Sequence, residues 1–221
     1  MSRSTLPFLL CSVTLAALPA DATALAGRLE GDTYVSANGE FRIRTPVLPE
    51  LGGRIEDSDA VVTFQDDYGT HISIACFELD ALQRWEFETR GRRDYLLYFF
   101  TDIVMANFTE RFPGSAVESA RYLPELLEGA LIGFSLLPGG SHFEDRTSLV
   151  DGSRPPVTAK RGTLLFVRHR HVYAVSTELS ERATQRLTYH QTSGQEDEQL
   201  SGRLTALAGR MSFSRDKPRE P

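Results

Sequence analysis

The feature that most constrains the fold of this chain is a run of helix-forming and apolar residues at Asp94–Phe112. Asp94 is placed to cap the start of a helix, and Pro113 and Gly114 are placed to end it. At about 100° per residue, one broad face of this helix is apolar. The face comprises Leu96, Leu97, Phe100, Ile103, Val104 and Phe108. Such a helix is unstable alone in water, so we expect it to pack on a large apolar surface.

Strand patterns before and after this helix supply that surface. Asn38-Gly39 favours a two-residue type I′ turn, and Asp66-Asp67-Tyr68-Gly69 predicts a second turn in which both aspartates are solvated. The expected strands are 33–36, 41–44, 60–64, 71–77, 115–123, 130–137 and the two arms of a hairpin at 162–177, and the further helices are 179–187 and 198–211. The predicted fold is α+β: a twisted antiparallel sheet with a long central helix and a C-terminal helix packed on it.

The first residues have the pattern of a secretory signal peptide. Within 1–26, a positively charged start precedes an apolar core at 6–18, and Ala24 and Ala26 are the small residues that a signal peptidase requires. We therefore expect cleavage before Gly27.

The same pattern sets the expected domain organisation and location. The apolar core of the leader is too short to cross a bilayer comfortably, so we expect no stable membrane span after cleavage. Residues 27–213 are expected to form a single secreted α+β domain, and 214–221 a flexible tail rich in charge. The expected location is the periplasm or the secreted fraction.

Charge and cysteine content narrow the partners. The formal net charge of −6 disfavours nucleic acid and anionic membrane surfaces as partners. After removal of the leader, Cys76 is the remaining cysteine, which excludes an internal disulfide. Cys76 lies in an apolar strand pattern, so we interpret it as a buried, inert thiol; a nucleophilic or intermolecular role is the alternative.

Three histidines form the best enzymatic candidate. His169 and His171 are two residues apart and could point the same way on a strand, and His142 could join them as a third metal ligand. However, the pair falls where the hairpin should turn, and the sequence contains no nucleotide-binding, nucleophile-elbow or zinc-binding motif. We therefore assign no catalytic, cofactor-binding or metal-binding residue, and a small metal-dependent hydrolase using His142, His169 and His171 remains an alternative.

Two further segments bear on binding. The polar loop at 141–161 is the first choice for a binding rim, although mobility alone would explain it. Arg90, Arg92 and Arg93 form a basic cluster that suits either a solvated helix entry or an anion contact.

The main helix has apolar residues on nearly all sides of its first two turns, which suggests another alternative, a carrier of a lipid or other apolar ligand. Tyr95, Tyr98 and Phe99 make the first two turns apolar nearly all round. An internal cavity beside Phe99 and Phe100 would favour the carrier, and tight packing there would favour a binding module.

The order of these elements resembles the PsbP-like family, named for an extrinsic protein of the photosystem. The resemblance is carried by 34–41 with Pro46 behind it, by the turn at 66–69, and by the closing helix that ends in Met211-Ser212-Phe213. It implies an antiparallel sheet with helices on its faces, and many such proteins are non-enzymatic assembly or interaction modules. It carries over no site residue. The leading prediction is a non-catalytic periplasmic or secreted binding or assembly module whose partner is a protein of the cell envelope.

Overall fold

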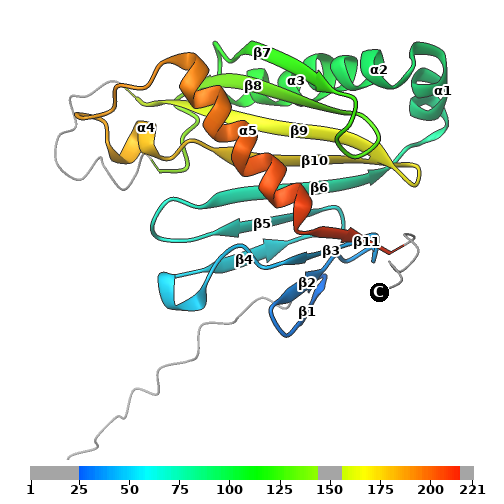
Figure 1. Cartoon of the computed structure of the whole chain (residues 1–221), viewed down its shortest axis with the longest axis horizontal. Coiled ribbons are helices and arrows are strands. Elements are labelled where there is room, and N and C mark those ends of the chain that lie inside the picture. The colour runs from blue at the N-terminus through cyan, green and yellow to red at the C-terminus, as the bar shows by residue number, and fades with distance from the viewer. Residues whose placement is uncertain (1–24, 144–155, 215–221) are drawn as a thin grey trace, which may run out of the picture.

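The computed structural model describes residues 25–143 and 156–214. Its main sheet has seven antiparallel strands in the order β4-β5-β6-β10-β9-β8-β7 (Figure 1). The strands are β4 (Arg54–Asp57), β5 (Val61–Gln65), β6 (His71–Glu78), β7 (Ala116–Leu123), β8 (Ala130–Pro138), β9 (Thr158–Arg168) and β10 (His171–Glu178). Since β6 pairs with β10, segments from both halves of the chain form one sheet.

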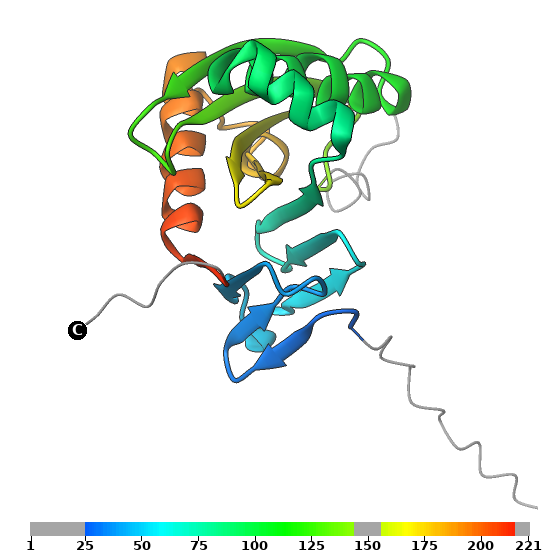
Figure 2. The ribbon, with the colours of Figure 1, turned by 90° about the vertical axis from the view of Figure 1, so that its right-hand side faces the viewer.

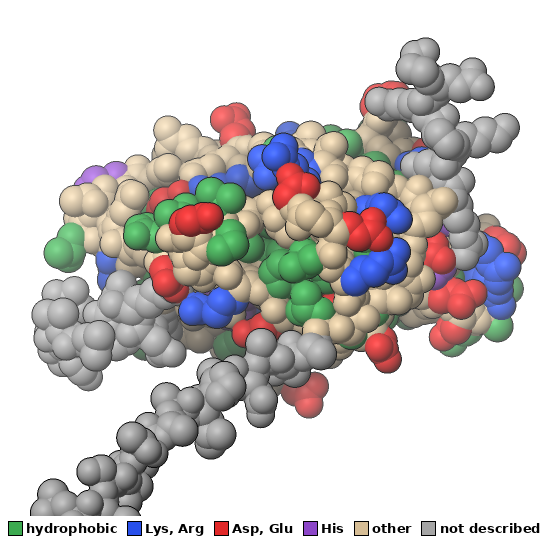
Figure 3. Space-filling view, turned by 90° about the horizontal axis from the view of Figure 1, so that it is seen from below, with side chains coloured by type: hydrophobic (Ala, Val, Ile, Leu, Met, Phe, Trp, Pro, Cys, Tyr) green, Lys and Arg blue, Asp and Glu red, His purple; other side chains and the backbone are tan. Residues whose placement is uncertain are grey.

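A smaller sheet brings the two ends of the described chain together. It has the order β1-β2-β3-β11, with β1 (Arg28–Glu30), β2 (Thr33–Val35), β3 (Phe41–Arg44) and β11 (Met211–Phe213). Met211 pairs with Ile43 and Phe213 with Phe41. The outer side chains of the first strands form exposed ion pairs such as Arg44–Asp32, and on this side of the molecule acidic and basic side chains are interspersed (Figure 3).

The turn between β2 and β3 differs from the prediction. The connection spans residues 36–40, and only Gly39 in it has a positive φ, whereas a type I′ turn requires positive φ at both central residues. The side chain of Asn38 explains the difference, because its Oδ1 accepts hydrogen bonds from Ser36 Oγ at 2.8 Å and from Glu40 N at 3.1 Å. The predicted turn after β5 is present, but Asp66 is buried rather than solvated and accepts three backbone N–H bonds in it.

The predicted central helix is continuous but not regular. It consists of α2 (Arg92–Tyr98), a π-helical segment η2 (Phe99–Val104) and α3 (Met105–Arg111), and it follows a separate helix α1 (Ala81–Arg90) after a break at Gly91. Asp94 does not cap the helix, because the helix begins two residues earlier with Gly91 at its N-cap. The helix ends before Pro113 as predicted.

The buried face of this segment also differs from the prediction at one position. Leu97 is 40% exposed, whereas Tyr95 and Phe99 are buried beside Leu96 and Phe100. In the first turns, the face that meets the sheet therefore includes Tyr95 and Phe99 and excludes Leu97.

The two faces of the main sheet are covered by different helices (Figure 2). α2, η2 and α3 pack on Leu131, Leu165 and Val172, while α5 (Ser193–Gly209) packs on the opposite side, against Leu164 and Phe166. Adjacent residues of β9 thus point to opposite faces, as the alternation of a strand requires. The predicted α+β fold with a central and a C-terminal helix on the sheet is confirmed.

Both predicted C-terminal helices are shorter or shifted. α4 (Glu181–Thr184) replaces the helix expected at 179–187, and α5 begins at Ser193 and ends at Gly209. Met211 was expected in that helix, but it belongs to β11, because Met211 and Phe213 are buried and alternate with exposed Ser212. Among the described residues, no helix is both long and apolar enough to span a bilayer.

Helix and sheet come very close at Gly133 in β8. A Cβ at this position would lie 2.3 Å from Cζ of Phe100, whose side chain is fully buried. The aromatic ring therefore rests on the backbone of the strand, and only glycine leaves room for it.

We expect Gly133→Ala to destabilise the fold by about 1–3 kcal/mol, the usual cost of overpacking a core. The matched control is Gly202→Ala in α5, where a Cβ meets nothing within 4 Å. There, alanine should raise stability by up to about 1 kcal/mol because of its helix propensity. Urea unfolding of both variants checks this, and equal effects at the two positions would contradict it.

Candidate functional site

Backbone strain marks one end of the main sheet. The non-glycine residues with positive φ in the described chain are Leu127 (50°), Glu128 (64°), His169 (48°) and Arg170 (67°). A left-handed conformation costs such residues on the order of 1 kcal/mol each. All four lie in two turns, one between β7 and β8 and the other between β9 and β10.

The two turns are neighbours. Ala130, at the start of β8, pairs with Phe166 near the end of β9. Across the gap, Glu128 Oε1 lies 3.8 Å from Arg168 Nη1. The strained residues therefore form a single cluster, and such clusters are frequent at functional sites.

Helix α1 lies opposite this cluster and encloses a surface groove of about 720 Å³ with it. The groove is lined by apolar side chains of Leu79, Trp85 and Phe87 and by the turn residues Glu128, His169 and Arg170. We refer to it as the α1 groove. The backbone of the turn is fixed to the start of the helical segment, because Leu79 N donates to Arg170 O at 2.9 Å.

The α1 groove carries an excess of positive charge on a chain whose net charge is negative. Four arginines line it against two glutamates, Glu88 and Glu128. Glu128 is shared between Arg92, at 3.9 Å, and Arg168, at 3.8 Å. The other two arginines, Arg84 and Arg170, have no ion pair with any residue in the described ranges.

Arg92 lines the groove and is held in place by contacts with its neighbours. Its Nη1 donates to Val167 O at 2.7 Å, and its guanidinium lies 5.4 Å from the centre of the Phe87 ring. Gly129 makes space for the stem of Arg92, since a Cβ there would lie 2.8 Å from Arg92 Cδ. These contacts hold one wall of the groove rigid.

Helix α1 exposes apolar side chains beside these cations. None of its residues is buried, and Leu82 and Trp85, which share one side of the helix, are 66% and 58% exposed. Phe87 anchors α1 by an edge-to-face contact with Tyr95, at 5.3 Å between ring centres. The helix is thus fixed by its inner side and presents an aromatic side chain to solvent.

The three candidate histidines are not brought together. His169 lies in the α1 groove, while His171 is buried with Nδ1 3.0 Å from His169 O. His142 is at the other end of β10, where its N–H donates to Glu178. Eight residues separate the two ends of that strand, which corresponds to about 24 Å at roughly 3.4 Å per residue. The proposed three-histidine metal site is therefore wrong in its geometry, and no three metal-ligating side chains cluster elsewhere within 25–143 and 156–214.

The basic cluster at the helix entry is divided between two roles. Arg92 reaches the α1 groove, whereas Arg90 pairs with Glu86 and lies 4.4 Å from the centre of the Tyr98 ring. Of the predicted rim at 141–161, residues 144–155 lie outside the described residues. Its last residues belong to β9, where Lys160 and Arg161 are buried, so this end of the segment is not a loop.

Cys76 and the aromatic residues of the main helix lie in packed surroundings. Cys76 is buried as predicted, and burial raises the pKa of its thiol, which opposes formation of a nucleophilic thiolate. Phe99 and Phe100 are buried, with Phe100 resting directly on Gly133. This is the tight packing that favours a binding module over an apolar-ligand carrier.

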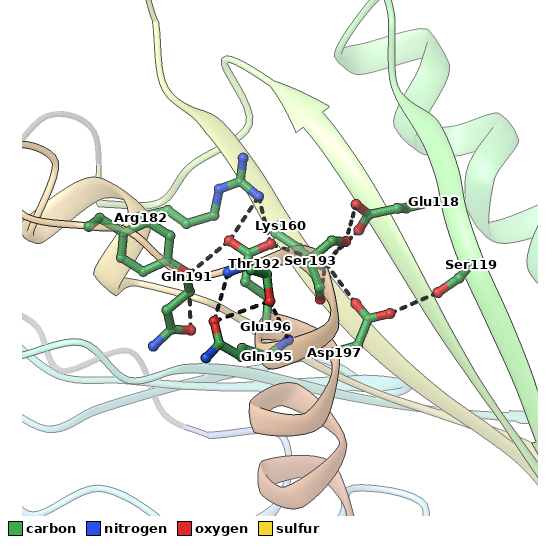
Figure 4. Close-up of polar contacts among 11 residues, drawn as sticks. Glu118, Ser119, Lys160, Arg182, Gln191, Thr192, Ser193, Gln195, Glu196 and Asp197 are labelled. Carbon is green, nitrogen blue, oxygen red and sulfur yellow. Dashed lines mark hydrogen bonds and ion pairs between the residues drawn. The ribbon is translucent and has the colours of Figure 1, made fainter.

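A buried ion cluster lies on the other face of the sheet, at the start of α5 (Figure 4). Nζ of the fully buried Lys160 is 2.5 Å from Glu118, 2.7 Å from Asp197 and 3.1 Å from Glu196, and it donates to Ser193 Oγ at 3.0 Å. Burial alone would lower the pKa of Lys160, but the hydrogen bonds to the three carboxylates raise it. The lysine therefore stays charged.

The contacts around this cluster are internal. Glu196 also accepts hydrogen bonds from Tyr189 at 2.8 Å and from Arg182 at 3.2 Å, and Asp197 accepts one from Ser119 at 3.0 Å. Because these partners come from β7, β9 and the segment around α4, the cluster joins α5 to the sheet. We interpret it as structural, and the α1 groove as the candidate functional site.

Neither the Lys160 cluster nor the α1 groove was predicted from the sequence. Lys160 stands at the polar start of a strand pattern, and nothing in its spacing to Glu118 or Asp197 indicates that they meet. Trp85 had a usable signal, since it is the single tryptophan of the chain and is surrounded by charged residues.

Comparison with known proteins adds a likeness of fold. No family model and no curated protein matches the sequence. The structure is similar to the solution structure of cyanobacterial PsbP from Synechocystis sp. PCC 6803, with 9% identity and a TM-score of 0.48 over 90% of this chain and 98% of that one. The predicted PsbP-like resemblance is thus found again, as a likeness in the arrangement of strands and helices.

Two other solved structures show a comparable likeness. The Saccharomyces cerevisiae Ran-binding protein Mog1p has 10% identity and a TM-score of 0.46, with 86% of this chain and 96% of that one covered. A structure from Bacteroides thetaiotaomicron VPI-5482 has 10% identity and a TM-score of 0.41, with 87% of this chain and 51% of that one covered. At these identities the likeness concerns the fold alone.

We expect Lys160→Met to destabilise the fold by about 3 kcal/mol, the lower end of the range for a broken buried ion pair, because it leaves buried Glu196 and the partly exposed Glu118 and Asp197 without their cation. Arg44→Ala, which removes one side of an exposed ion pair, is the control and should change stability little. Thermal unfolding of both variants measures the difference. A Lys160→Met protein as stable as the parent would show that the cluster does not hold α5.

The stability of the fold should also decrease as the pH falls, because partly buried His71 resists protonation. Its ring stacks on that of His142 at 3.5 Å, and burial, together with His142 and Arg161, lowers its pKa to about 3. The unfolded chain takes up this proton near pH 6.5 and the folded chain does not, so stability is full above about pH 6.5 and declines toward pH 3, by at most about 1.4 kcal/mol per pH unit.

His71→Phe keeps a ring on His142 but removes the proton site, so its stability should decline less steeply over the same pH range. Urea unfolding at pH 7, 6 and 5 compares the two proteins. Parallel pH profiles would contradict the assignment.

Proposed function

We propose that this protein is a non-catalytic binding or assembly module of the cell envelope, and that the α1 groove binds an acidic segment of a partner protein. The observation that carries the proposal is the position of exposed Trp85 beside Arg84 and Arg170, which have no ion pair with a described residue. The leader pattern of 1–26 supports the location outside the cytoplasm.

The side chains of the groove suit recognition of a protein. Tryptophan and arginine are the residues that most often dominate the energy of protein interfaces. Arginine binds carboxylates through two parallel N–H bonds, and Leu82 and Trp85 offer apolar area for a leucine or aromatic side chain of the same segment. A partner segment with one apolar residue between acidic residues would satisfy both.

The groove is less suited to catalysis. Its charged donors are guanidinium groups, which do not give up a proton in proteins and therefore bind anions rather than transfer protons. The left-handed backbone of the two turns costs folding energy. The positioning of Glu128, His169 and Arg170 would explain this cost, because a binding surface requires side chains in fixed positions.

The single tryptophan gives a direct test. Peptides that place leucine or phenylalanine among aspartates and glutamates should bind with a change in Trp85 emission, and the affinity should fall as salt rises. Arg84→Glu or Arg170→Glu should weaken binding about tenfold or more, since each removes a charge-assisted hydrogen bond. Arg93→Glu, an equal change of charge at an exposed position outside the groove, should have a smaller effect.

A crosslinking experiment tests the same surface in the cell envelope. A photoreactive amino acid at position 85 should crosslink to a partner protein, and the product should disappear with Arg84→Glu. The control is the same amino acid at Leu187, which is 78% exposed, does not line the groove, and follows α4 at the end of the molecule opposite α1 (Figure 1). Equal crosslinking from both positions, or products that survive the charge reversal, would overturn the proposal.

A further inference from the structure

The first residues of the described chain are fastened to the edge of the main sheet. Asp57, at the end of β4, accepts a hydrogen bond from Ala26 N at 2.8 Å and another from Gly27 N at 2.7 Å. The hydroxyl group of Tyr34 donates to the same carboxylate at 2.7 Å. Three donors, from Ala26, Gly27 and Tyr34, thus converge on the carboxylate of Asp57.

The position of Gly27 admits no side chain. A Cβ there would lie 2.5 Å from Val35 O and 2.6 Å from the hydroxyl oxygen of Tyr34. The glycine backbone is therefore pressed against β2, with its nitrogen directed at Asp57. A residue with a Cβ would move this nitrogen away from the carboxylate.

The sequence singles out the same position for another reason. Ala24 and Ala26 are the small residues that a signal peptidase requires, which places the cleaved bond between Ala26 and Gly27. From this coincidence we propose that Gly27 is the mature N-terminus and that Asp57 and Tyr34 form a binding site for its free ammonium group. The inference shares the expected export with the proposed function and is independent of the α1 groove.

The chemistry of processing suits the site. Hydrolysis adds water across the Ala26–Gly27 amide: the C–N bond breaks, the water oxygen forms the carboxylate of Ala26, and the nitrogen of Gly27 takes up protons to become an ammonium group. Asp57 loses the N–H of Ala26 as a donor, but the ammonium group has three N–H donors and a positive charge. The bond from Gly27 thereby becomes charge-assisted, and such bonds are roughly twice as strong as neutral ones.

The protonation states of the site fit this role. Burial would raise the pKa of Asp57, but the hydrogen bonds from Gly27, Tyr34 and Ala26 hold it below its usual value, so the carboxylate is charged at neutral pH. Burial and the neighbouring Asp57 raise the pKa of Tyr34, so its hydroxyl group remains a donor. Asp57 belongs to the main sheet and Tyr34 to the small one, so the mature N-terminus would hold the two sheets together.

The first test is the N-terminus itself. The full chain is exported to the periplasm of a bacterial host, recovered, and its first residue is identified by mass spectrometry. Gly27 is the expected result, and any other mature start overturns the proposal.

The second test measures whether the amine is bound. On the recovered protein, an amine-reactive acylating reagent at neutral pH should modify the Gly27 nitrogen about tenfold more slowly than in Asp57→Asn, since a charge-assisted bond of this strength must open first. Tyr34→Phe should give an intermediate rate. Equal rates in the parent and Asp57→Asn overturn the proposal.

A third measurement covers the case in which Asp57→Asn fails to fold. Acetylation of Gly27 in the parent protein removes the charge without changing any side chain of the site. It should lower the unfolding temperature of the parent, and an unchanged temperature overturns the proposal. Peptide binding at the α1 groove should be the same before and after acetylation, which separates this inference from the proposed function.

Discussion

The central strands β8 and β9 are buried on both faces, and the rest of the structure depends on this constraint. A strand with two buried faces must be covered twice, so the chain provides the α2–α3 segment on one side and α5 on the other. Where a covering helix comes very close to the strand, the strand has a glycine, as at Gly133 under the ring of Phe100. Where a charged side chain is buried between the sheet and α5, as Lys160 is, three carboxylates surround it.

Stabilising and strained features lie in different parts of the molecule. The cluster around Lys160 satisfies its own charges and fastens α5, whereas the α1 groove combines left-handed turns, exposed Trp85 and arginines without an ion pair among described residues. A region that is costly for the fold and open to solvent is where binding is expected, because selection for stability alone would replace His169-Arg170 by residues that prefer positive φ. This contrast, more than any motif, separates the structural cluster from the candidate functional site.

The fold class followed from local signals, and the sites did not. The alternating strands and the end of the central helix at Pro113 are encoded by neighbouring residues, so they could be predicted from the sequence. Residues that meet across the sheet, such as Glu118 with Lys160 or Glu128 with Arg168, are far apart in the chain, and no spacing rule connects them. The π-helical turn at η2 and the strand at Met211–Phe213 were missed because tertiary packing overrides the local preference for α-helix.

The pairing of β11 with β3 is a contact between segments that are far apart in the sequence. Phe213 aligns with Phe41, so the small sheet is completed only when nearly the whole chain is available. Contacts with this sequence separation have a high loop-closure entropy, which slows folding. A truncated polypeptide that lacks its last segment would leave the edge of β3 without its partner strand, an open template for association with other chains. β11 therefore protects an edge of β3 that would otherwise be open to association with other chains.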